Sequence, residues 1–241
     1  MDHVPLLFAE SVARLIDFSS LCQLKESRSS LFGNVSRSLL EKRLYVTLYV
    51  VYNPAAGTFD YCLTCRRNYG SISSYDPADR RVVFLFKLVL LEGKSFLNNM
   101  DGDVTWTTAT PSDPTFLKLL RAPFARTELR LDVNCPELLR LMQGYCTFNC
   151  VSAYGAFAYN EVLDAIIERS QASGRLESVH CTEFFKKRGI EESIDWISTN
   201  KRLRMLSGYL IENPASVRSA LNSQGNLADC PLQILTSYST F

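Results

Sequence analysis

The sequence has few histidines, no excess of charge of either sign and no long apolar run. Its 241 residues include two histidines, and 26 Lys and Arg balance 25 Asp and Glu, for a formal net charge of +1. Such a chain has no global positive field to attract a phosphate backbone. The longest apolar run, 82–91, contains Lys87 and reaches about half of the roughly twenty residues that a membrane-spanning helix needs. We therefore expect neither a nucleic-acid-binding protein nor a membrane protein.

The N-terminus also lacks the features of a secretory signal. It begins Met1-Asp2-His3, and no basic region precedes its short apolar stretch. The eight cysteines are then expected to be small buried thiols, since disulfides are rare in proteins that stay inside the cell. These observations predict an intracellular protein, cytoplasmic or nuclear.

Catalytic and metal-binding constellations are not evident. His3 lies at the terminus, and His180 lies within a predicted apolar strand, 176–181, where a structural role is favoured. Cys62 and Cys65 have the spacing of a zinc or redox motif. In a strand, however, positions i and i+3 face opposite sides of the sheet. The sequence thus favours a protein that is not an enzyme and that holds no cofactor or metal.

The first 43 residues show helical periodicity. Apolar residues recur at steps of three and four, and three short helices account for them: Phe8, Val12, Leu15 and Ile16, then Leu21 and Leu24, then Leu31, Val35, Leu39 and Leu40. From residue 44 the period changes to two. We therefore predict a helical module at 1–43, followed by a different kind of structure.

Residues 44–110 are β-rich. The strand 44–52 and a returning strand at 58–66 form a predicted hairpin around a turn containing Pro54 and Gly57. A further strand at 81–91 is apolar on both faces, as expected when both are covered. A short strand at 103–109 centres on Trp106. Periodicity does not fix strand partners, so the sequence leaves open whether these strands form a separate antiparallel sheet or continue a later one.

Residues 111–241 alternate strand and helix patterns. Apolar strands are predicted at Leu129, Phe148, Leu176, Leu203 and Leu232, and the last four are 27 to 29 residues apart. Predicted helices at 136–141, 159–169, 190–197 and 214–221 fill the gaps. One strand and one helix per unit would suit irregular leucine-rich-repeat-like βα repeats, but any α/β protein can space its strands in this way. The fold class is therefore α+β, with a helical module at 1–43 and a mixed α/β body at 44–241.

The helical module carries a family resemblance. Val4-Pro5 stands in the place of an opening Leu-Pro, and Val12 and Leu15-Ile16 follow on the first helix. Leu21 and Leu24 lie on the second helix, and Phe32 lies near a position usually held by Trp. On these residues the module resembles an F-box, and the chain is similar to the large, divergent group of nematode F-box-like proteins.

The resemblance implies a protein-binding, substrate-recruiting adaptor. Such a module buries its leftover apolar side chains against a Skp-type linker protein of a cullin-type ubiquitin ligase, while the body holds a target protein of unknown identity. The residues that the resemblance assigns to linker binding are Val4, Pro5, Val12, Leu15, Leu21, Leu24 and Phe32.

Two alternatives stay open from the sequence. An α/β scaffold or protein-binding repeat protein would have a purely structural helical N-terminus that covers the open end of its sheet. An enzyme of unfamiliar type would gather carboxylates, cysteines or His180 in a deep pocket. The first alternative is distinguished from the adaptor by whether the apolar residues of the module are exposed or are buried against the body.

Overall fold

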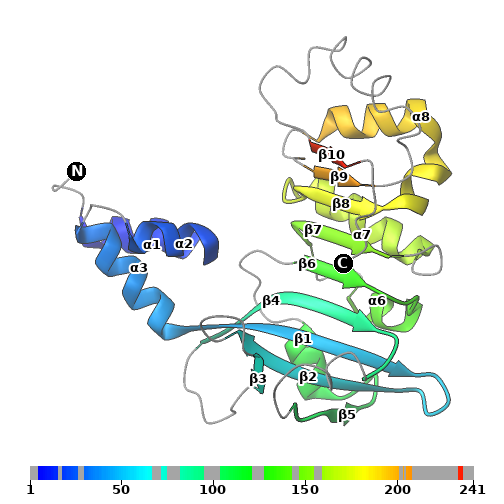
Figure 1. Ribbon diagram of the computed structural model, residues 1–241, viewed down its shortest axis with the longest axis horizontal. Helices are drawn as coiled ribbons and strands as arrows, with labels where there is room; N and C mark the ends of the chain where they lie inside the picture. Colours follow the sequence, from blue (N-terminus) through cyan, green and yellow to red (C-terminus); the bar gives the residue numbers. More distant parts are fainter. Residues whose placement is uncertain are drawn as a thin grey trace.

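The protein is described from a computed structural model, and the fold is mixed α/β (Figure 1). The structure describes residues 5–15, 18–26, 30–66, 72–74, 82–94, 104–120, 128–142, 147–154, 159–200, 203, 205–207 and 233–235. A small group of helices comes first in the chain, and a large sheet with helices on one face follows.

The helical module consists of α1 (Leu6–Leu15), α2 (Phe18–Lys25) and α3 (Ser30–Lys42). These are the three short helices that the apolar periodicity predicted. Helix α3 continues directly into strand β1 (Arg43–Asn53), where β-branched and aromatic residues replace the helical pattern. The change from helix to strand therefore falls one residue before the predicted boundary.

The first strands form the hairpin that the sequence predicted. β1 pairs antiparallel with β2 (Thr58–Arg66), and Gly57 adopts a φ of 62° in the turn between them, a conformation that glycine tolerates without strain. Two short strands, β3 (Ile72–Ser74) and β5 (Thr107–Ala109), pair with the other edge of β2. The predicted strand at 103–109 is therefore shorter than expected and excludes Trp106.

The sheet continues on the other side of β1 with parallel strands. β1 pairs with β4 (Val82–Leu91), and β4 pairs with β6 (Glu128–Leu131). Beyond β6 lie β7 (Cys150–Ala153), β8 (Ser178–Cys181), β9 (Met205–Ser207) and β10 (Gln233–Leu235), and the order across the sheet is β10-β9-β8-β7-β6-β4-β1-β2-β3. The β-rich segment thus continues the later sheet, which the sequence had left open.

Successive strands of the second half are related by a nearly constant spacing. Cys150, Ser178, Met205 and Gln233 are register partners in adjacent parallel strands, so the spacings are 28, 27 and 28 residues. The sequence predicted strands at this spacing from the positions of its apolar residues.

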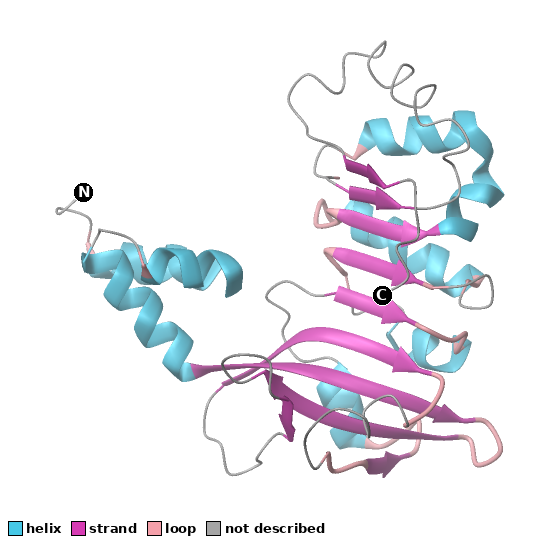
Figure 2. Cartoon of the chain, in the orientation of Figure 1, coloured by secondary structure: helices cyan, strands magenta, loops and turns pink. Residues whose placement is uncertain are grey.

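Helices α5 (Pro114–Leu120), α6 (Pro136–Met142), α7 (Glu161–Ala172) and α8 (Thr182–Thr199) pack on one face of the sheet (Figure 2). The side chain of Asn160 caps α7 by accepting from the backbone N–H of Val162 and Leu163, a role that asparagine commonly fills at a helix start. Helix α8 begins earlier than the predicted 190–197 and bends at Gly189, and α5 was not predicted. The predicted helix at 214–221 lies outside the described residues.

The body has apolar clusters on both faces of its first strands. Leu88 and Leu90 of β4 belong to the large cluster beneath the helices, whereas Val89 and Leu91 belong to a smaller cluster on the opposite face. The prediction that this strand is covered on both sides is confirmed. Cys65 lies in the first cluster and Cys62 in the second, so the two thiols face away from each other, as strand geometry requires.

Within the described part of the chain, no helix is both long enough and apolar enough to cross a membrane.

Candidate functional site

The helical module has a hydrophobic core of its own. Ala9 and Ala13 of α1, Leu21 of α2 and Val35 of α3 are buried together. Leu31, Phe32, Leu39 and Leu40 pack against them and are partly buried. Helices α1 and α2 make their main contacts with α3, and α3 meets the body where it joins β1. The module therefore packs mainly on itself, and it projects from one end of the sheet (Figure 1).

Helix α1 has more apolar surface than this core uses. Its buried face is made of two small residues, Ala9 and Ala13, whereas Leu6, Leu7 and Phe8 are 54%, 76% and 56% exposed. At about 100° per residue, Leu7 lies nearly opposite the buried face of the helix. We call Leu6, Leu7 and Phe8 the α1 apolar turn. Three large apolar side chains at one helix end form a patch of the kind that marks protein-protein contacts.

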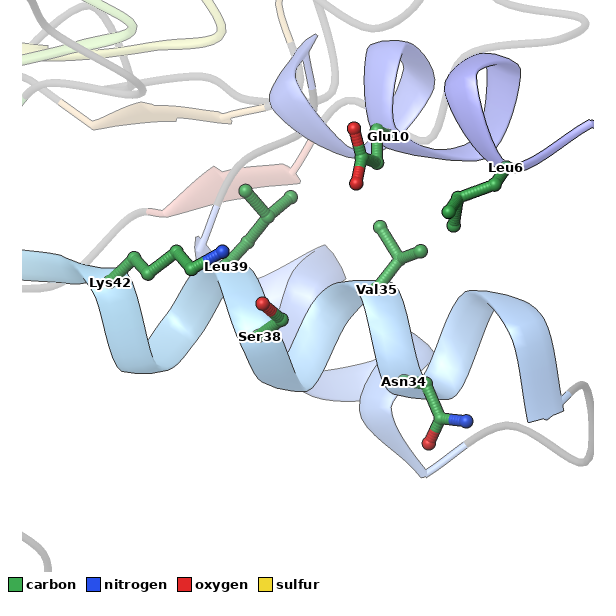
Figure 3. Close-up of a pocket in the computed structure, with 7 residues that line it drawn as sticks. All are labelled: Leu6, Glu10, Asn34, Val35, Ser38, Leu39 and Lys42. Atoms are coloured by element: carbon green, nitrogen blue, oxygen red, sulfur yellow. The ribbon is translucent and has the colours of Figure 1, made fainter.

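A groove lies beside the α1 apolar turn, between α1 and α3 (Figure 3). It has a volume of about 280 Å³ and is lined by Leu6, Glu10, Asn34, Val35, Ser38, Leu39 and Lys42. Leu6 and Glu10 point from α1 toward Val35 and Leu39 on α3. One carboxylate and no cysteine or histidine line this groove, so it suits an apolar side chain better than it suits catalysis.

The residues assigned to linker binding are distributed unevenly over the module. Pro5 is exposed at the start of α1, where its carbonyl oxygen accepts from the backbone N–H of Phe8 and Ala9 at 3.0 and 3.1 Å. Val12, Leu24 and Phe32 are partly buried.

Three of the assigned residues do not contribute to the described surface. Leu21 is fully buried in the module core, so it supports the fold of the module from within. Leu15 belongs to α1, but its side chain lies outside what the structure describes, as does the whole of Val4. Leu7, the most exposed of the large apolar residues, was not among the predicted contacts. The signal was present, because three consecutive apolar residues cannot all face one side of a helix.

The second surface lies on the sheet, opposite the helices. Leu129, Val151 and Val179 point into the core beneath α6 to α8, so the alternate residues of the same strands point to the other face. This polar sheet face comprises Lys87, Glu128, Arg130, Asp132, Cys150, Ser152, Tyr154, Ser178 and His180.

Charged residues of the polar sheet face are paired along β4 and β6. Lys87 Nζ lies 2.6 Å from Glu128 Oε1, and Arg130 Nε lies 2.9 Å from Asp132 Oδ1. The Arg130 guanidinium also stacks on Tyr154, 4.9 Å from the ring centroid. Tyr154 is 44% exposed and is the one exposed large apolar residue of the described chain that lies outside α1. The face thus combines an arginine and an exposed tyrosine, two residue types that dominate binding energy at interfaces.

Three side chains of β7 and β8 on the polar sheet face are hydrogen-bonded to one another. Ser178 Oγ lies 2.9 Å from His180 Nε2 and 3.2 Å from Cys150 Sγ. Burial lowers the pKa of the His180 imidazole and raises that of the Cys150 thiol, so both are neutral near pH 7. A serine next to a histidine base has the geometry of an activated nucleophile. Ser178 nevertheless lies in mid-sheet, where neighbouring N–H groups point along the ladder and not toward a substrate, so this row suits binding better than acyl transfer.

No described group of three or more His, Cys, Asp or Glu residues is arranged to hold a metal ion. Comparisons of the chain with protein-family models, curated proteins and solved structures gave no match. The α1 apolar turn and the polar sheet face are therefore the two features from which a function is inferred.

Proposed function

We propose that the chain is a non-enzymatic adaptor with two binding ends. Its F-box-like helical module, residues 1–43, binds a Skp-type linker subunit of a cullin-type ubiquitin ligase. Its α/β body, with irregular leucine-rich-repeat-like βα units, holds the protein to be modified. The observation that carries the proposal is a module with a separate core that still exposes the α1 apolar turn.

The exposed apolar area would contribute to association. Full burial of a leucine or phenylalanine side chain stabilises by about 1.5–3 kcal/mol, and each residue of the α1 apolar turn is more than half exposed. A partner that covered all three would gain roughly 3–5 kcal/mol on this scale. Leu6 also lines the adjoining groove, which would let a side chain of the partner enter between α1 and α3.

The body supports the second half of the proposal through its topology. From β6 to β10 the strands are parallel and adjacent in chain order, and a helix lies between β6 and β7, between β7 and β8, and between β8 and β9. Units that stack only on their neighbours in this way produce extended open surfaces suited to binding proteins. On the polar sheet face of these units, Tyr154 is exposed and Arg130 is partly exposed, and this is the face that we propose for the target.

The alternative of a scaffold whose helical N-terminus covers the open end of the sheet requires a different distribution of apolar contacts. A helical start that covered the open end of the sheet would bury its apolar residues on the body. The described core of the module instead contains residues of α1, α2 and α3 alone. This favours the adaptor over a scaffold with a purely structural N-terminus.

The test is binding of the purified chain to Skp-type linker subunits, with Leu7→Asp and Phe8→Asp as variants. Both positions lie in the first turn of α1, where an acidic residue interacts favourably with the helix dipole, so the variants should fold. We expect the intact chain to bind and each variant to bind at least about tenfold more weakly, the equivalent of 1.4 kcal/mol.

Tyr154→Ser is the matched control, because it removes an exposed large apolar residue of the body. It should leave linker binding unchanged. If the intact chain does not bind any linker subunit, or if Leu7→Asp binds as tightly as the intact chain, the proposed function is wrong.

A further inference from the structure

We draw no further inference here: the strongest candidate, the groove between α1 and α3 where Glu10 and Lys42 flank Leu39, belongs to the linker-binding surface already proposed, and nothing among the described residues shows what else would cover it.

Discussion

Leu21→Ala should unfold the helical module while the body stays folded. Leu21 is fully buried in the module core, and truncating a buried leucine to alanine costs about 2–5 kcal/mol. A core of this size rarely supplies more than about 3–5 kcal/mol, so the substitution removes most of the module's stability. The body has its own clusters, to which Leu21 does not contribute, and should lose little.

The two tryptophans make this separation measurable. Trp106 packs on the smaller cluster of the body and Trp196 lies in α8, so tryptophan fluorescence reports on the body alone. Far-ultraviolet circular dichroism also detects the helices of the module. We expect urea unfolding of Leu21→Ala to show early loss of helical signal and an unchanged fluorescence midpoint. Val151→Ala, in the core of the body, should shift the fluorescence midpoint instead.

The opposite result would refute the separation of the two cores. If fluorescence and circular dichroism of Leu21→Ala move to lower urea together, the module and the body unfold as one cooperative unit. The exposed α1 apolar turn would then be part of a rigid whole, and the case for a self-contained docking module would lose its physical basis.

Three further predictions concern the body. Arg188→Ala should cost about 1–3 kcal/mol, because the largely buried Arg188 side chain bonds to Glu168 and its guanidinium stacks 3.6 Å from the centroid of the Phe184 ring. The fluorescence of Trp196, which donates to Glu168 at 3.1 Å, should change as well. An unchanged urea midpoint would contradict this prediction. Gly189→Ala should also lower the free energy of unfolding in urea by about 1–3 kcal/mol, because Gly189 has φ 73° and ψ 177° inside α8. An added Cβ would meet no atom within 4 Å, so the cost comes from backbone strain alone. Burial lowers the pKa of His180 below its ordinary value of 6.5; the unfolded chain therefore binds more protons below that pH, and stability falls as the pH falls. His180→Gln should lose stability less steeply than the wild type between pH 7 and pH 5 in urea titrations, and parallel curves would contradict this cause.

Local pattern was sufficient for most elements of the structure. The steps of three and four residues before residue 43 gave three helices, and the alternation after it gave the hairpin of β1 and β2. The helix predicted at 159–169 corresponds to α7, which begins after its N-cap Asn160. Helix α5 was missed, because its apolar residues, Phe116, Leu117, Leu119 and Leu120, form a run too short to distinguish seven helical residues from a strand.

The candidate surfaces were predicted less completely. A resemblance assigned contacts to Leu21 and Phe32, but burial in a small helical core depends on how three helices cross, which periodicity alone does not fix. Leu7 was overlooked although the sequence carried a signal for it, since three consecutive apolar residues cannot all face one side of a helix. The pairing of Arg130 with Tyr154 joins residues of neighbouring strands, and strand register is a property of the sheet and not of either segment.

The sequence by itself determined the elements, the change from helical to strand period near residue 43 and the spacing of strands in the second half, because these follow from propensity and from the repeat of apolar residues. Only the tertiary structure decided that all described strands form one sheet, that the two faces of its first strands carry separate apolar clusters, and that the module keeps a core apart from the body. These facts depend on contacts between residues far apart in the chain, whose free energy no local pattern contains.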